Sequence, residues 1–371
     1  MIPYNRHVVE EDDVAAVCEA MRSDWLSQGP KVAEFEKALA VYCTVPFAIV
    51  FSSGTAALEA AYFSAGINDG DEIITTPLTF VATASAALWQ GARPVFCDVD
   101  IATGNIDVGQ IESLISPRTK AIVPVDYAGR PVDYDALTDI TKRHGLLSVA
   151  DASHSLGATY RGRKVGSLAD LTVLSFQSIK TITTGEGGAV LTRDRAMADR
   201  LYAFRMHGIT RRHDDWRYEV GELGHNYRLT DIQCALGVSQ LRKVDRFVRR
   251  RLEIAREYLA DFMDSLELIM PLPAETSSWH LFPVRLRLDK LRSGRAEIFK
   301  GLRDAGIGVQ VHYIPVHLHP MYQSRGYSRE LCPRAVEFYE SEISLPIFPT
   351  LSDKDRKQVV VTVKDVLSKN A

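Results

Sequence analysis

The chain has few cysteines, and no pattern pairs them. It contains five, an odd number, widely spaced and without a Cys-x-x-Cys. A disulfide framework and a zinc knuckle are therefore disfavoured, and a reducing compartment is expected. The first residues, MIPYNRHVVEEDD, contain no apolar signal-peptide core, and no apolar stretch approaches the length that spans a bilayer. We therefore expect a cytoplasmic protein that does not bind a membrane.

Charge of one sign and nucleotide-binding glycine patterns are also scarce. The formal net charge of −3 provides no long-range attraction to nucleic acid. No G-x-G-x-x-G occurs, which argues against a nicotinamide-dependent oxidoreductase. The small-residue turn Ser52-Ser53-Gly54-Thr55 is not followed by the lysine of a P-loop. No repeat or low-complexity tract is present.

What is present is the patterning of an α/β protein. The chain has 371 residues, 46% of them hydrophobic, which suits one large and one smaller domain. Two helices are expected before residue 45, on either side of the break at Gly29-Pro30. Short β-rich runs then alternate with helical or loop segments, at 72–76, 94–99, 121–126, 146–151, 171–176 and 189–192. Several runs are apolar on both faces, as in a parallel sheet covered by helices.

The second half of the chain is less regular. A long helix is predicted from about residue 230, and mixed elements follow, including 281–286, 295–304 and 309–313. We predict a large domain at 1–246 and a small α/β domain at 247–371. Ligands of open α/β sheets bind beyond the carboxyl ends of the strands. Polar residues just after strands are therefore candidate site residues, namely Thr79, Asp126, Asp151, His154 and the segment 175–180.

Three features carry chemistry. Ser53 and Gly54 open a helix of small residues, which suits either a phosphate cradle or a plain N-cap. Asp151 ends an apolar strand, where a carboxylate needs a cationic partner such as a protonated pyridine nitrogen, or serves as an N-cap. Lys180 follows an apolar strand and precedes close-set glycines, as expected of a shielded lysine that must be neutral to attack an aldehyde.

The order of these residues is more specific than each one alone. Gly54-Thr55, Phe80, Asp151, Ser175 and Lys180 occur in the order found in fold-type-I pyridoxal-5′-phosphate (PLP) enzymes, and the chain resembles the DegT/DnrJ-type sugar aminotransferases along nearly its whole length. The most specific stretches are SSGTAAL (52–58), ITTPLTFVATASA (74–86), DASHSLGA (151–158), SFQSIKTITTGEGG (175–188) and GHNYRLTDIQCALG (224–237). The implied fold is a large domain with a mostly parallel mixed sheet between helices, plus a smaller C-terminal domain.

The resemblance also implies roles. Lys180 corresponds to the Schiff-base lysine, Asp151 to the partner of the pyridine nitrogen, and Phe80 to the aromatic stacked on the ring. His154 corresponds to the residue at the phenolic oxygen, and Gly54, Thr55 and Ser175 to the phosphate ligands. Asn226 corresponds to an asparagine that reaches the phosphate of the neighbouring subunit, which implies a homodimer with shared sites. The cofactor would alternate between PLP and pyridoxamine 5′-phosphate.

One branch of the family is more similar than the rest. MHGITR (206–211), GIGVQVHYIPVHLHPMY (306–322) and SLPIFPTLSD (344–353) resemble the C4 aminotransferases of pseudaminic acid biosynthesis. These aminate a UDP-linked 4-keto-6-deoxy-N-acetylhexosamine with L-glutamate, releasing 2-oxoglutarate. The candidate substrate contacts are Gln28, Tyr127, Arg228, His312 and His317. Arg228 could equally form an ordinary ion pair at a helix start. Two departures bear on the sugar: Asp126 replaces the usual His, and Gln177-Ser178-Ile179 replaces His-Pro-Val.

Alternatives remain at this point. A sugar dehydratase of the same fold would carry His in place of Lys180, and a regulatory relative would not need the lysine. Other nucleotide keto-sugars, GDP- or dTDP-linked and aminated at C3 or C4, stay open. His312, His317 and His319 invite a metal interpretation, but their spacing fits no common zinc pattern. A loop that lines the ligand cleft is the preferred interpretation of that segment.

Overall fold

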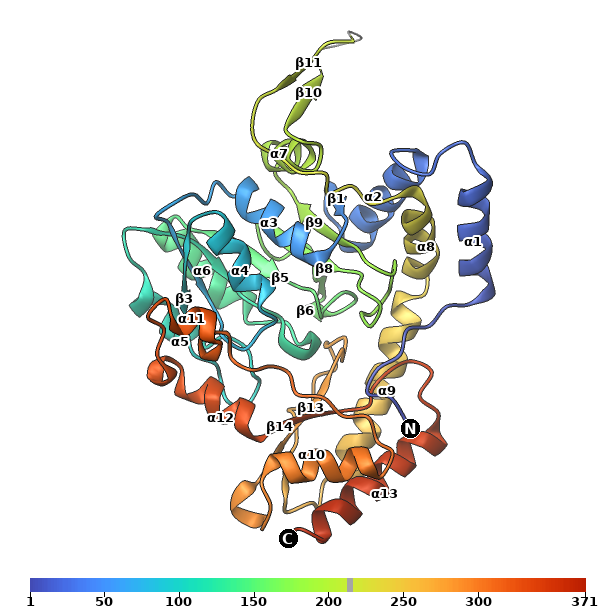
Figure 1. Ribbon diagram of the computed structural model, residues 1–371, viewed down its shortest axis with the longest axis vertical. Coiled ribbons are helices and arrows are strands. Elements are labelled where there is room, and N and C mark those ends of the chain that lie inside the picture. Colours follow the sequence, from blue (N-terminus) through green and yellow to red (C-terminus); the bar gives the residue numbers. More distant parts are fainter. Residues whose placement is uncertain (212–215) are drawn as a thin grey trace.

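A seven-stranded sheet forms the centre of the large domain (Figure 1). The computed structural model describes residues 1–211 and 216–371. The strands are β1 (Phe47–Phe51), β2 (Glu72–Thr75), β3 (Arg93–Phe96), β4 (Thr119–Val123), β5 (Leu147–Asp151), β8 (Leu171–Ser175) and β9 (Gly188–Thr192). Their order is β1-β9-β8-β5-β4-β2-β3, and β9 runs antiparallel to both of its neighbours while the other paired strands are parallel. The expected mostly parallel mixed sheet is confirmed.

Helices cover both faces of this sheet (Figure 1). Successive strand residues point to opposite faces, so Ile73 joins one hydrophobic cluster and Ile74 the other. One face packs against α2 (Pro30–Cys43), α6 (Tyr134–His144) and α8 (Asp231–Leu241), and the other against α3 (Gly54–Ser64), α4 (Ala82–Trp89) and α7 (Arg195–Arg205). Two further helices of this half are α1 (Glu11–Arg22), which packs on α8, and the short α5 (Val108–Ile111).

The long helix expected from residue 230 is interrupted. It comprises α8 and α9 (Val244–Asp261), with Arg242 and Lys243 between them. Val244 and Phe247 of α9 belong to the large-domain core, whereas Ile254 and Tyr258 belong to the C-terminal core. The predicted boundary between residues 246 and 247 therefore falls inside a helix that contributes to both cores.

The C-terminal part is built on a small antiparallel sheet. Its strands are β12 (Leu268–Ile269), β13 (Phe282–Leu286) and β14 (Glu342–Leu345). Its helices are α10 (Arg295–Asp304), α11 (Pro320–Gln323), α12 (Pro333–Ser341) and α13 (Asp353–Ser368). The segment 309–313 is not a strand, although Gln310 forms one bridge to Ser344 of β14. Tyr322 and Phe338 pack against the large domain, and residues 312 and 313 lie beside Asp151 and Ser175 at the ends of β5 and β8.

Two hairpins complete the described chain. One consists of β6 (Thr159–Tyr160) and β7 (Arg163–Lys164), and the other of β10 (Ile209–Arg211) and β11 (Tyr218–Val220). The second hairpin extends away from the body of the molecule beyond α7 (Figure 1). Short 3-10 turns occur at Glu112–Leu114, Tyr127–Gly129, Leu288–Lys290, Val316–Leu318 and Arg329–Leu331. Within the described ranges, no helix has both the length and the apolar character needed to cross a membrane.

Candidate active site

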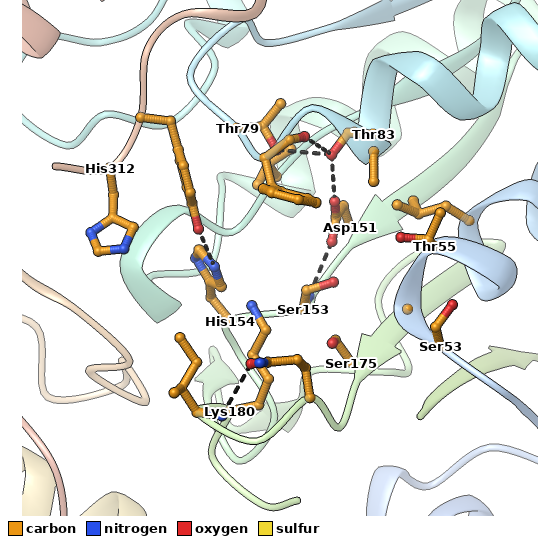
Figure 2. Close-up of a pocket in the computed structure, with 18 of the residues that line it drawn as sticks. Ser53, Thr55, Thr79, Thr83, Asp151, Ser153, His154, Ser175, Lys180 and His312 are labelled. Carbon is orange, nitrogen blue, oxygen red and sulfur yellow. Dashed lines mark hydrogen bonds between the residues drawn. The ribbon is translucent and has the colours of Figure 1, made fainter. Parts of the chain in front are cut away.

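A cavity of about 450 Å³ lies at the carboxyl ends of β5 and β8, beside the first turn of α3 (Figure 2). Seven residues predicted to bind the cofactor line it, namely Gly54, Thr55, Phe80, Asp151, His154, Ser175 and Lys180. They come from segments that are distant in the sequence, since more than 120 residues separate Gly54 from Lys180. The sheet brings them together because parallel strands end at one common edge.

Asp151 ends β5 with both carboxylate oxygens engaged. Thr83 Oγ1 donates to Oδ2 at 2.7 Å, and the backbone N–H of Ser153 donates to Oδ1 at 3.1 Å. The Thr83 hydroxyl also lies 2.8 Å from that of Thr79 (Figure 2). Only 5% of Asp151 is exposed, and no described cation forms an ion pair with it. The residue is therefore a buried, oriented carboxylate that faces the cavity and suits a cationic ligand atom.

Lys180 enters the same cavity from the loop after β8. Its backbone N–H donates to the carbonyl of Gln177 at 2.9 Å, which closes a turn and directs the side chain into the cavity (Figure 2). Burial lowers the pKa of Lys180 to about 8, while the nearby carboxylates of Asp151 and Glu186 raise it. The amine is thus neutral far more often at physiological pH than an exposed lysine, as a nucleophile requires.

The first turn of α3 forms another wall. Ser53 caps the helix by accepting a hydrogen bond from the N–H of Ala56 at 3.0 Å. The opening N–H groups of a helix have no intrahelical partners, so this turn attracts an anion. A Cβ on Gly54 would lie only 2.9 Å from the Cβ of Ser175, so glycine allows the helix to approach β8. Gly188, the first residue of β9, also lies close to this turn, since a Cβ there would lie 2.5 Å from the carbonyl oxygen of Ser53.

An aromatic cluster lines the opposite wall. The Tyr313 hydroxyl lies 3.0 Å from His154 Nε2, and the two rings stack with centroids 6.0 Å apart (Figure 2). Phe80 meets the edge of Tyr313 at 6.3 Å and is 58% exposed, although it is a large apolar ring. Burial, with the nearby charge of Lys180, lowers the pKa of His154 well below its usual range, so the ring is neutral.

Other predicted site residues lie elsewhere. Asn226 is exposed at the base of the β10–β11 hairpin and does not line this cavity. Gln28 and Arg228 line a separate surface hollow beside α7. Tyr127 is buried and donates to the carbonyl of His312 at 2.5 Å, whereas His317 is buried against Phe96, with ring centroids 6.1 Å apart. Of the five predicted substrate contacts, only His312 lines the cavity.

The two departures from the branch occupy different places. Asp126 is 1% exposed and accepts hydrogen bonds from Ser155 Oγ, Tyr134 Oη and the N–H of Val132 at 2.6–3.1 Å. It supports the turn after β5 without reaching the cavity. Burial raises its pKa to about 7 against these hydrogen bonds. Gln177 and Ile179 do line the cavity, directly before Lys180.

Sequence reasoning missed several lining residues, among them Tyr4, Thr83, Ser153, Glu186 and Tyr313. Thr83 had a usable signal, because it follows Thr79 by one helical turn after a predicted strand. Tyr4 had none, since long-range contacts hold it at the site: the parallel bridge between Ile2 and Ile307, and the hydrogen bond from the N–H of Ile347 to the carbonyl of Tyr4 at 3.1 Å. Within residues 1–211 and 216–371, no group of three or more His, Cys, Asp or Glu side chains is arranged to hold a metal ion.

The cavity fits PLP on features of this structure. The helix turn at Gly54 matches the phosphate, Asp151 the pyridinium proton, and Lys180 the aldehyde. Phe80 offers an open aromatic face, and His154 Nδ1 is a buried ring nitrogen without a partner among the described residues. Each polar part of the cofactor thus has a complementary group.

Comparison with known proteins gives the same result. Residues 7–364 match the DegT/DnrJ/EryC1/StrS aminotransferase family. A UDP-4-amino-4,6-dideoxy-N-acetyl-β-L-altrosamine transaminase of Campylobacter jejuni is 38% identical over 374 residues, covering 100% of this chain and 98% of that one. The structure superposes on Helicobacter pylori PseC, an aminotransferase of pseudoaminic acid biosynthesis, with a TM-score of 0.96, 38% identity and 99% coverage of both chains.

A third relative bears on the cofactor. The putative sugar aminotransferase Spr1654 from Streptococcus pneumoniae, solved in its PLP form, has a TM-score of 0.93 and 32% identity, covering 99% of both chains. The same protein has also been solved in its PMP form. Fold and site thus define a PLP-dependent transferase. The chain belongs to the DegT/DnrJ/EryC1/StrS aminotransferase family and is a PLP-dependent aminotransferase.

Proposed function

We propose that this enzyme transfers the amino group of L-glutamate to the C4 keto carbon of UDP-2-acetamido-2,6-dideoxyhexos-4-ulose. The products would be UDP-4-amino-4,6-dideoxy-N-acetyl-β-L-altrosamine and 2-oxoglutarate, in pseudaminic acid biosynthesis. The observation that carries the proposal is that Lys180 and Asp151 line one cavity, in a chain that aligns over its whole length with altrosamine transaminases. The cavity defines the reacting centre, and the alignment covers the whole fold.

The residues divide the chemistry among them. PLP, when bound, supplies an electron sink for the α-carbon of the amino donor. Asp151, fixed by Thr83 and Ser153, holds the proton on the ring nitrogen that makes this sink effective. Lys180 Nζ is the base in the cavity that can take a proton from the donor α-carbon and return it to C4′, the aldehyde carbon of the cofactor. The first turn of α3 fixes the phosphate.

The reaction consists of two half-reactions at one site. L-Glutamate must leave as 2-oxoglutarate before the keto-sugar enters, because both use the same cavity beside Lys180. Initial rates at several fixed concentrations of the second substrate should therefore give parallel lines, as ping-pong kinetics require. Intersecting lines would contradict the shared site.

We also propose a homodimer in the cytoplasm. Asn226 lies outside the cavity of its own chain, which suits a residue that serves a neighbour. The projecting hairpin region carries exposed apolar side chains, with Trp216 and Leu223 each 88% exposed, which suits burial in an interface. All five cysteines are free, which suits a reducing compartment.

The first experiment is a visible spectrum of the purified protein with PLP, before and after L-glutamate. We expect glutamate to abolish the visible band of Lys180-bound PLP, and the correct keto-sugar nucleotide to restore it. The UDP-linked 4-keto sugar should do so. The dTDP- and GDP-linked keto sugars are tested as alternative substrates, because Gln177 and Ile179 line the cavity where the branch usually has His and Val. Restoration by one of these alternatives alone would overturn the sugar assignment. A band that no amino donor alters would indicate a relative without turnover.

A further inference from the structure

His312 is held at three points by residues outside the cavity. Its N–H donates to Glu342 Oε2 at 2.8 Å, and its carbonyl accepts from the Tyr127 hydroxyl at 2.5 Å. Its ring Nδ1 lies 2.8 Å from Ser344 Oγ. The ring lines the cavity next to Tyr4, with centroids 5.7 Å apart, and its Nε2 makes no hydrogen bond to another described residue. Nε2 is therefore the polar atom of His312 that remains for a ligand.

Ser344 connects this ring to a carboxyl group. Ser344 Oγ lies 2.5 Å from Glu342 Oε1, so Glu342, Ser344 and His312 form one hydrogen-bonded chain. Glu342 and Ser344 are fully buried and His312 is 6% exposed. No function described above for Lys180 or Asp151 requires this chain, yet burying a carboxyl group is costly.

The serine hydroxyl has one proton and can donate in one direction only. When Glu342 is ionised, Ser344 donates to the carboxylate, so His312 must carry its proton on Nδ1 and Nε2 is an acceptor. When Glu342 is protonated on Oε1, it donates to Ser344, which then donates to Nδ1. His312 must in that case carry its proton on Nε2, which becomes a donor.

The ring itself stays neutral in both states. Burial, with the charge of Lys180, lowers the pKa of His312 to about 3, so its two nitrogens share one proton at physiological pH. Burial raises the pKa of Glu342 to about 8, against the hydrogen bonds from Ser344 and from the N–H of His312. Glu342 can therefore change its charge near pH 8.

The groups that face Glu342 come from several elements. Arg295 of α10 favours the ionised form from a distance. Arg285 is directly opposite on β13, but its guanidinium lies 3.8 Å from Glu337. Tyr127, which lies outside the cavity, and Tyr313, which lines it, are also near, and the charge of Glu342 raises the pKa of both hydroxyls in addition to the effect of burial. None of these groups forms a close ion pair with Glu342 in the described chain.

We propose that the proton on Glu342 sets the tautomer of His312 through Ser344, and so decides whether Nε2 offers the sugar substrate an acceptor or a donor. Uptake of one proton at Nε2 moves the Nδ1 proton to Ser344 and the hydroxyl proton to Glu342 Oε1, so the protons balance. An N-acetyl N–H requires the acceptor and an N-acetyl carbonyl requires the donor. Glu342 and Ser344 are thus positioning residues, and the sugar part of the inference rests on the proposed function.

The test is the tautomer itself, read from long-range 1H–15N spectra of the 15N-histidine-labelled holoenzyme without sugar. The resonance is assigned by its loss in His312→Gln. Wild type should change from Nε2–H to Nδ1–H as the pH rises through about 8. Glu342→Gln should stay in the Nε2–H form, because its amide can donate to Ser344 while its carbonyl keeps the N–H of His312. Ser344→Ala should uncouple the ring from Glu342.

The control is Glu340→Gln, because that carboxylate is exposed and pairs with Arg329 on the surface. It should titrate like wild type. A wild-type tautomer that is constant with pH, or a change that persists in Glu342→Gln, would overturn the proposal. The second result would assign the titration to another group, such as Lys180. These spectra need no sugar, so failure to aminate any keto-sugar would count against the proposed function and not against the tautomer chain.

A kinetic readout then links the chain to substrate. In Glu342→Gln the pH dependence of kcat/KM for the keto-sugar should lose the contribution of Glu342 near pH 8 and keep that of Lys180, whose pKa is also about 8, while the profile of the glutamate half-reaction should not change. Equal changes in both half-reactions would indicate a general structural effect and would refute a role at the sugar.

Discussion

Thr83 donates a 2.7 Å hydrogen bond to Asp151, across 68 residues of sequence. Thr83 lies in the first turn of α4, and Asp151 is the last residue of β5. The backbone N–H of Ser153 engages the other carboxylate oxygen at 3.1 Å. The two neutral donors orient the carboxylate without cancelling its charge, which leaves that charge for the ring nitrogen of the cofactor.

This relationship predicts the effect of Thr83→Val, which keeps the shape and removes the hydroxyl. A hydrogen bond to a charged group is worth about 1.5–3 kcal/mol. We therefore expect PLP affinity to fall by about ten- to 150-fold, measured by absorbance titration of the apoenzyme. Thr83→Ser should restore most of the affinity. Unchanged binding in Thr83→Val would show that the hydroxyl does not position Asp151.

A second prediction concerns Lys180 and pH. Only the neutral amine attacks an aldehyde, and the pKa of Lys180 is lowered to about 8. The rate at which PLP attaches to the apoenzyme should rise by about tenfold per pH unit below that value and level off above it. Stopped-flow absorbance measures this rate, and Lys180→Ala should show no visible band. A rate still rising at pH 10 would indicate a lysine with its ordinary pKa.

Most of the central sheet could be predicted from the sequence because its strands are short apolar runs separated by clear helical segments. All six predicted strands exist within a few residues of their expected ends. An element was expected at 295–304 without its type, and the structure shows there the helix α10 with the same bounds. The break between α8 and α9 could not be predicted, since the apolar spacing of Leu241, Val244 and Phe247 continues through it.

The site divides in the same way. Residues that end strands were predictable, because the carboxyl ends of parallel strands lie at one edge of the sheet and this does not depend on the conformation of the loops. Residues that depend on the C-terminal domain were not, because nothing local shows which of His312, Tyr313 and His317 faces the cavity. Packing decides it: His317 turns into the Phe96 cluster, while Tyr313 turns towards His154. Whether Gln28, Tyr127, Arg228 and His317 contact the sugar stays a prediction.

A third prediction tests the close approach at Gly54. In Gly54→Ala the new methyl group would lie 2.9 Å from the Cβ of Ser175, so the helix must move away from β8. Overpacking of this kind costs about 1–3 kcal/mol, and we expect PLP affinity to fall by about five- to 150-fold as the phosphate-binding N–H groups shift. Gly221→Ala is the matched control, since nothing lies within 4 Å of its added Cβ. Equal affinity in both variants would show that the cradle tolerates a side chain.

The last prediction tests whether the active sites are shared between subunits. Asn226 is exposed and lies outside the cavity that contains Lys180 of its own chain. Lys180→Ala and Asn226→Ala should each be defective alone. A mixed dimer, purified through two different tags, should regain activity because one of its sites receives an intact lysine and an intact asparagine. A mixture of Lys180→Ala with Lys180→Arg is the control and should stay inactive, since neither site then has the lysine. If the first mixture stays as inactive as the control although mixed dimers form, Asn226 does not act across the interface. Asn226 would then act within its own chain, and the exposed side chains of Trp216 and Leu223 would need another partner.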